Sequence, residues 1–270
     1  MGNRRHSWRG RLAGYRSAQL VNPGLLLNNV VDKDVQSMLF PLNLIQNIMF
    51  CPKYRIKDNF ITPNSLISNF GSLIGTLIFI FSFVYRMYEL YSEGYISTIQ
   101  FSFYFNCIFY CVGLAINFIV SIYQTKRNIT FVLFFQKIHR FLNMKTRSRR
   151  FIIWNWITII VVLGFFITFF TFVNMVVAVP PIYAFSCIIL VSFDINLVYA
   201  IRLIKLLEDK VLLWNIQSLN SENIGTIVDD VYYKRMFQAY INILKCYDTY
   251  KVCFGQYVSS CIYISNMYSR

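Results

Sequence analysis

Few side chains in this sequence are suited to acid–base, metal or redox chemistry. The chain contains two histidines, His6 and His139, and its seven cysteines are irregularly spaced without a CxxC pair. Metal sites and disulfide frameworks need several ligands or cysteines at recurring spacings. We therefore expect no metal site and no cofactor, and we interpret the cysteines as buried, reduced hydrophobic residues.

Asp194 is the only acidic residue inside a long apolar stretch. An ionisable group within a membrane is costly, and such a residue is a candidate functional group by default. It lies about two helical turns from the end of the stretch, where Arg202 or water could reach it, so a structural role stays open. Asp194 and His139 are too isolated to form the paired acid and base of a membrane enzyme, and we expect no enzymatic activity.

A row of polar residues could line a ligand pocket. Asn106, Tyr110, Gly113 and Asn117 recur at helical spacing and share one helix face. Amides in hydrocarbon must be hydrogen-bonded, so this face should point into a helical bundle. It serves either helix–helix hydrogen bonding or the lining of a pocket for a small organic ligand. The candidate ligand-binding residues in the second case are Asn106, Tyr110, Thr171, Asn174 and Tyr183.

The elements that would position these residues are membrane-spanning helices. The chain is 56% hydrophobic and only 14% charged, against roughly 25% charged residues in ordinary globular proteins. A spanning helix needs about 20 mostly apolar residues. The uncharged stretches predict spans near 66–86, 97–123, 151–177 and 181–203, the last two divided by Pro180-Pro181. The stretch 253–268 is uncharged but polar, and we interpret it as the start of a fifth span.

The placement of lysine and arginine predicts the orientation of these spans. Counted along the chain with the span edges included, the segments between spans hold 9, 1, 8, 0 and 8 basic residues. Cytoplasmic loops carry an excess of these residues. The alternation predicts a multi-pass membrane protein with a cytoplasmic N-terminus. The net charge of +14 then serves orientation and contact with anionic membrane lipid, and we expect no nucleic-acid partner.

Small residues and amphipathic patterns predict how the helices pack. Ser68, Gly71 and Gly75 recur at spacings of three and four in the first span, which is typical of close contacts between membrane helices. Beyond the fourth span, apolar residues keep helical spacing as far as Trp214 and again from Met236 onward. We expect these to be two cytoplasmic helices that pack on one another.

The predicted fold class is therefore all-α: a multi-pass transmembrane helical bundle with cytoplasmic anchor helices. Residues 1–35 are basic and carry no apolar periodicity until residue 24 or later. We expect this segment to be poorly ordered.

Several loose motifs follow one another in a specific order along residues 36–262. They are Phe40-Pro41-Leu42, the basic stretch from Lys53 to Asn59 before Thr62-Pro63, a basic helix around Phe134 to Leu142, and the helix from Tyr240 to Tyr250 that leads to Phe254-Gly255. In this order and spacing the chain resembles the insect gustatory receptor family, within the insect chemoreceptor superfamily.

The resemblance implies a receptor with seven spans, of which residues 36–270 would be a partial chemoreceptor domain. Members of the family are ligand-gated cation channels that assemble as tetramers through their cytoplasmic anchors. The corresponding anchor residues here are Tyr240, Leu244, Tyr247, Phe254 and Gly255. The expected function is a taste-receptor subunit that binds a small-molecule tastant and assembles as a homo- or hetero-tetramer. The pore-lining seventh span is not found, so we interpret the chain as C-terminally truncated. An odorant receptor of the same superfamily and an unrelated multi-pass transporter are the alternatives.

Overall fold

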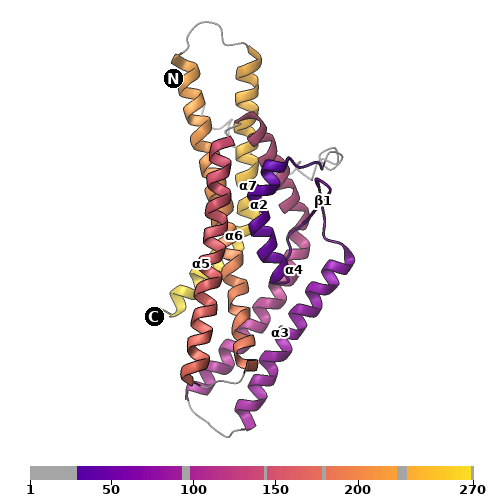
Figure 1. The fold of residues 1–270 in the computed structure, drawn as a ribbon, viewed down its shortest axis with the longest axis vertical. Helices are drawn as coiled ribbons and strands as arrows, with labels where there is room; N and C mark the ends of the chain where they lie inside the picture. The colour runs from indigo at the N-terminus through magenta and orange to yellow at the C-terminus, as the bar shows by residue number, and fades with distance from the viewer. Residues whose placement is uncertain (1–28, 93–97, 143–144, 178–180, 224–229, 269–270) are drawn as a thin grey trace, which may run out of the picture. The chain divides into compact units, whose positions relative to one another are not determined.

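The computed structural model describes residues 29–92, 98–142, 145–177, 181–223 and 230–268, and Figure 1 shows a mainly helical chain. The elements are α2 (Lys33–Ile48), β1 (Arg55–Lys57), β2 (Phe60–Thr62), α3 (Leu66–Ser92), α4 (Thr98–Phe141), α5 (Lys145–Val177), α6 (Pro181–Asn223) and α7 (Asp230–Tyr268). All of them belong to one compact unit that begins at Val31. The expectation of a mainly helical fold is confirmed.

A short antiparallel hairpin departs from the all-α prediction. Arg55 pairs with Thr62, and Lys57 pairs with Phe60. Between the strands, Asp58 and Asn59 adopt φ angles of 52° and 66°, a left-handed conformation that Asp and Asn tolerate better than most residues. Each strand has three residues, which is too short to show the alternation that identifies a strand in a sequence.

Three long helices are apolar enough to cross a membrane, judged by length and composition. Their apolar segments are Leu66–Glu89 in α3, Ile108–Phe141 in α4 and Arg149–Phe172 in α5. Most of each segment is not buried, and large side chains such as Phe81 and Phe165 are exposed. Continuous exposed apolar surface on a long helix suits lipid better than water.

The apolar segment in α4 is longer than a membrane is thick. Its 34 residues would measure about 51 Å as a helix, against about 30 Å for the hydrocarbon core. Lys126 and Arg127 interrupt it, and charged residues are expelled from hydrocarbon. The part of α4 that follows Lys126 is therefore best interpreted as an extension outside the membrane.

Two of the spans proposed from the sequence stay predictions. The helix boundary expected at the proline pair is present, because α5 ends at Val177 and α6 begins at Pro181, where proline fits the first helical turn. Side chains 181–190 lie outside the described residues, so the span 181–203 is not tested. The same holds for the start of a span at 253–268.

The densest core forms where the extended part of α4 meets the other helices. α7 packs along α4 and α6, α3 packs along α4, and α2 packs on α5 and α6 (Figure 1). The buried apolar residues in this core include Val132, Phe135, Ile138, Leu203, Leu206, Ile243 and Cys246. This basal core, which lies beyond Lys126 along α4, sets the positions of the three longest helices relative to one another.

The described end of the predicted poorly ordered segment is in fact held in place. Of residues 1–35, the structure describes 29–35 and leaves 1–28 outside the described part. Val31 is buried, and its backbone N–H donates to the carbonyl of Asn59 over 2.7 Å. Contacts with distant residues, which sequence composition does not show, hold this part of the chain, and the expectation for residues 1–28 lies outside the described residues.

Candidate functional site

An exposed apolar stripe runs along α7. Its members are Tyr233, Phe237, Tyr240, Leu244 and Tyr247, which are between 39% and 64% exposed. They recur every three or four residues and therefore share one helix face. Charged residues such as Lys234, Arg235 and Asp248 intervene along the same helix. This α7 stripe is thus an apolar surface in a charged segment, which is typical of a protein-binding face.

Contacts with α6 and α4 hold α7 against the basal core and orient the stripe, and one of them reaches the stripe residue Tyr240. Trp214 of α6 donates its indole N–H to the carbonyl of Met236 over 3.0 Å, and its ring packs on Tyr240 at a centroid distance of 5.2 Å. The Cys246 thiol donates to the carbonyl of Phe131 in α4 at 3.7 Å. The predicted packing of the two amphipathic helices on one another is confirmed by the contacts between α6 and α7.

The predicted anchor residues divide into two groups. Tyr240, Leu244 and Tyr247 lie on the α7 stripe and are exposed. Phe254 is only 3% exposed and packs on the rings of Tyr199 and Tyr250. The Phe254 ring is thus buried within the chain, between α6 and α7, and its assignment to the anchor stays a prediction. Gly255 lies one residue further, where an added Cβ would contact the Lys251 side chain at 3.8 Å.

A buried polar core lies where the segment after α2 enters the bundle. The Asn117 amide donates to the Cys51 thiol over 3.2 Å, and the Ser121 hydroxyl donates to the carbonyl of Pro52 over 3.0 Å. The Asn196 amide from α6 lies 3.5 Å from the Asn117 carbonyl oxygen. Asn117 therefore takes the packing role, which was one of the two alternatives for its polar face.

Burial shifts the pKa values of the two titrating groups that follow Cys51 in the chain. Lys53 is 1% exposed, and its burial lowers the pKa of the ammonium group, while the neighbouring thiols of Cys51 and Cys253 oppose that shift. Burial raises the pKa of Tyr54 to about 12. Neither group is accessible to solvent, so this polar core positions helices rather than performing chemistry on a dissolved substrate.

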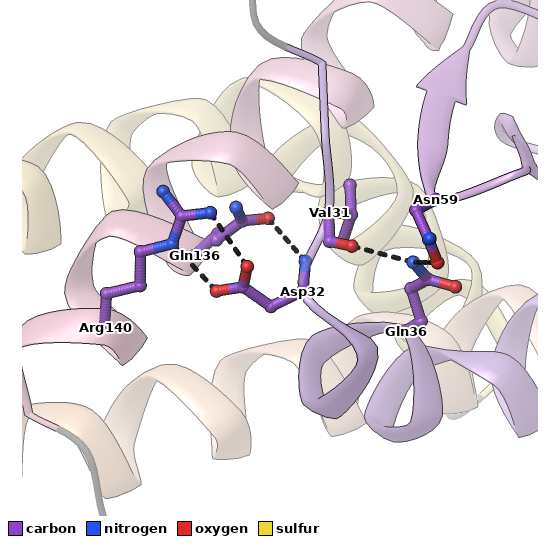
Figure 2. A network of polar contacts seen from close by, with 6 residues as sticks. All are labelled: Val31, Asp32, Gln36, Asn59, Gln136 and Arg140. Atoms are coloured by element: carbon purple, nitrogen blue, oxygen red, sulfur yellow. Dashed lines mark hydrogen bonds and ion pairs between the residues drawn. The ribbon is translucent and has the colours of Figure 1, made fainter.

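A network of polar contacts fastens the start of α2 to α4 and to the hairpin, as Figure 2 shows. Its members are Val31, Asp32, Gln36, Asn59, Gln136 and Arg140. Two nitrogens of the Arg140 guanidinium each donate to one carboxylate oxygen of Asp32 over 2.8 Å. This bidentate contact lowers the pKa of Asp32. Gln36 donates to Val31 and to Asn59, which ties α2 to the hairpin turn.

A cavity of about 240 Å³ borders this network. It is lined by Asp32, Lys33, Asp34, His139 and Arg140. The Lys210 ammonium lies 2.8 Å from Nδ1 of the buried lining residue His139. Burial and the neighbouring Lys210 lower the pKa of His139 to about 4, so the imidazole is neutral near pH 7 and accepts that hydrogen bond. Within the described residues, no group of three or more His, Cys, Asp or Glu side chains is arranged to hold a metal ion.

The predicted ligand-binding residues have different surroundings. Tyr110 stacks on Phe83 of α3 at a centroid distance of 6.2 Å, beside an apolar cluster of Phe79, Phe83 and Leu114. Thr171 is exposed and donates to the carbonyl of Ile167 in its own helix. The side chains of Asn106, Asn174 and Tyr183 lie outside the described residues. The ligand pocket stays a prediction.

One glycine on the small-residue face of α3 lies close to another part of the chain, and that part is a turn rather than a helix. A Cβ built on Gly75 would overlap the ring of Phe50, in the turn after α2, whereas one on Gly71 would meet nothing within 4 Å. Ser68 accepts a hydrogen bond from Ser72 through its backbone carbonyl. Within the described chain an aromatic ring therefore fills the space at Gly75, and helix packing through Ser68, Gly71 and Gly75 stays a prediction.

One polar junction was missed in the sequence. The Asn155 amide donates to the carbonyl of Met38 over 2.8 Å, and its oxygen accepts from Arg202 over 2.6 Å. The Arg202 guanidinium also lies over the ring of Phe151. At this junction Arg202 contacts α5. Asp194, for which Arg202 was an expected neighbour, is exposed on α6. A lone asparagine in an apolar helix has no spacing signal by which it could have been recognised.

The chain matches no protein-family model, no curated protein and no solved structure. What is established is a mainly helical protein with three helices long and apolar enough to cross a membrane.

Proposed function

We propose that this chain is a subunit of a multi-pass chemoreceptor of the plasma membrane that resembles insect gustatory receptors. In this proposal the basic ends of the helices are cytoplasmic, and several subunits assemble into a cation channel opened by a small-molecule tastant. The single observation that carries the proposal is the α7 stripe, because an assembly needs a face that can bind another subunit outside the hydrocarbon.

The composition of the stripe supports assembly. Three of its five members are tyrosines and one is a phenylalanine, and aromatic residues are enriched in the cores of protein interfaces. Burying the exposed half of such a side chain contributes about 1 kcal/mol. The five residues together supply several times that amount at each contact between subunits, before the entropic cost of association is subtracted.

The placement of the stripe supports coupling between assembly and the membrane helices. The stripe lies on a helix that packs along α4 and α6, both of which continue into the apolar part of the bundle. A subunit bound at the stripe would therefore contact α7, which packs on the two helices that carry the predicted ligand residues Tyr110 and Tyr183. The proposed binding of a tastant rests on the resemblance to insect gustatory receptors alone.

The test compares two charge substitutions of exposed apolar residues. Phe237→Glu lies on the stripe, and Leu219→Glu is the matched control on α6, with exposed fractions of 64% and 61%. The tagged full chain is expressed in cultured cells, its surface amount is measured, and its assembly size is read by native gel electrophoresis in mild detergent. We expect the wild type and Leu219→Glu to form oligomers and Phe237→Glu to run as a smaller species at equal surface amount.

The receptor part of the proposal needs a second measurement. Cells that express the chain together with complete gustatory receptor subunits are recorded while a panel of small organic tastants is applied. We expect the wild-type chain to change the tastant-evoked cation current and Phe237→Glu not to change it. A monomeric wild type would contradict the proposed assembly. A tastant-evoked current that is the same with and without the wild-type chain would contradict the receptor function.

A further inference from the structure

An open apolar groove lies between the beginning of α3 and α4. This α3–α4 groove has a volume of about 500 Å³ and is lined by Leu66, Ile67, Asn69, Phe70, Leu73 and Phe118. Leu66 and Ile67 are 87% and 85% exposed. Asn69 is the one polar side chain among the six. The groove is therefore a nearly continuous apolar surface with a single hydrogen-bonding group.

The groove lies at the end of an apolar segment. Its α3 residues open the segment Leu66–Glu89, and Phe118 belongs to the apolar part of α4. In a protein that crosses the membrane with these helices, the groove faces lipid rather than water. An acyl chain can fill such a surface without ordering any polar group, whereas water there would lose hydrogen bonds.

Basic residues of α4 lie just beyond the groove. From Phe118 to Lys126 the helix rises about 12 Å, and the Lys126 side chain is exposed. The guanidinium of the next residue, Arg127, lies over the ring of Tyr123 at 5.5 Å, an arrangement that is typical of the membrane interface. No acidic residue occurs in α4 from Thr98 to Phe141, so the positive charge of this helix is not offset along its own length.

The hairpin adds a second exposed positive group near α4. The hydrogen bond between Ser121 and the Pro52 carbonyl holds the chain leading to β1 beside α4. Arg55 opens β1 and is exposed. Lys57 lies 4.0 Å from Asp58, so its charge is partly offset and Arg55 is the stronger attraction for an anion.

We propose that the α3–α4 groove is a binding site for an anionic phospholipid. An acyl chain lies in the groove, the Asn69 amide donates to an ester carbonyl of the lipid, and the phosphate headgroup lies against Lys126 and Arg55. The apolar lining selects a lipid over a dissolved anion, and the basic residues at one end select an anionic over a zwitterionic headgroup. Each basic residue near an anionic membrane surface contributes about a fivefold change in binding.

The experiment measures which lipids remain bound to the purified full chain. The protein is reconstituted into nanodiscs of phosphatidylcholine mixed with phosphatidylserine, and retained lipids are counted by native mass spectrometry. We expect phosphatidylserine to be retained in preference to phosphatidylcholine. Lys126→Gln, which removes one positive charge, should lower its retention about fivefold, and Lys126→Glu, which reverses the charge, should lower it further in the same direction. Ile67→Trp, which fills the groove at an exposed position, should lower the retention of both lipids.

Lys137→Glu is the matched control, because it makes the same charge change on an exposed residue of α4 further from the groove. Equal losses for Lys126→Glu and Lys137→Glu would show that only net charge matters and would overturn the site. Unchanged lipid retention in Ile67→Trp would overturn the groove as the place of binding. A change in oligomer size in Ile67→Trp without a change in bound lipid would show that a protein helix covers the groove, and would also overturn the proposal.

Discussion

Replacing Gly75 by alanine tests whether the turn after α2 fixes the packing of α3. The added Cβ would lie 2.6 Å and 2.8 Å from the two Cδ atoms of Phe50, whereas carbon atoms pack at about 3.5–4.0 Å. Turning the ring about its Cβ–Cγ bond gives no relief, because the Cγ atom on that axis is itself in the way. Phe50 must therefore rotate about χ1 or move its backbone, which already holds a φ of 57°.

The two glycines of α3 allow the magnitude to be worked out. Alanine is about 1 kcal/mol more favourable than glycine inside a helix, and Gly71→Ala should show this gain because its Cβ meets open space. At Gly75 the same gain is opposed by overpacking, which typically costs about 1–3 kcal/mol. Gly75→Ala should therefore change stability by about 0–2 kcal/mol in the destabilising direction. The two variants should differ by about 1–3 kcal/mol.

A double-mutant cycle attributes this difference to the ring. Unfolding of the purified chain is followed in detergent for Gly71→Ala, Gly75→Ala, Phe50→Ala and Phe50→Ala with Gly75→Ala. Without the ring, Gly75→Ala should stabilise as much as Gly71→Ala does. If Gly75→Ala already stabilises the wild-type background by that amount, the close approach to Phe50 does not exist in the protein and the reasoning is refuted.

Two further predictions concern pH. Asp32→Asn should lower stability at neutral pH by about 1 kcal/mol or less, because the contact with Arg140 is partly exposed. Since Arg140 lowers the pKa of Asp32 below 3.8, the wild type should lose this advantage as the pH falls through that lowered value, and a difference that persists at the most acidic pH would contradict it. The pKa of His139 is about 4 in the fold against an ordinary 6.5, so the unfolded chain binds a proton first and stability should fall between about pH 6.5 and 4. His139→Gln should flatten that part of an unfolding-versus-pH series, and equal slopes in the two proteins would count against a buried neutral imidazole.

The helices could be predicted from the sequence because their signals are local. Long uncharged stretches bounded by charged residues form much of α3, α4 and α5, and α6 begins at Pro181, the second proline of the pair. Hydrocarbon excludes charge over about 20 residues at a time, so the pattern can be found without knowing any tertiary contact. The amphipathic spacing in α7 is of the same kind and predicted the helix, but not which of its apolar residues are buried: Met236 and Ile243 are, whereas Tyr240 and Tyr247 are exposed.

The contacts that position the helices could not be predicted, because they join residues far apart in the sequence. Phe50 against Gly75, Asn155 with Met38, and Asp32 with Arg140 carry no local periodicity. Tyr110, a candidate ligand-binding residue whose side chain is described, illustrates the same limit. Tyr110 shares a helix face with Asn117, yet it stacks on Phe83 of the neighbouring helix. The helical spacing predicted the helix face on which Tyr110 lies, but not the residue that it contacts.

The basal core links the two proposed binding surfaces. It holds α7 against α4 through Cys246 and Phe131, and Phe131 follows Lys126 by little more than one helical turn. The α7 stripe and the basic end of the α3–α4 groove are therefore both positioned by the same stretch of α4. A protein bound at the stripe and a lipid bound in the groove would each stabilise the same arrangement of helices. By linkage, a lipid that binds this arrangement more tightly than its alternatives must also favour assembly at the stripe, and assembly must favour the lipid by the same factor.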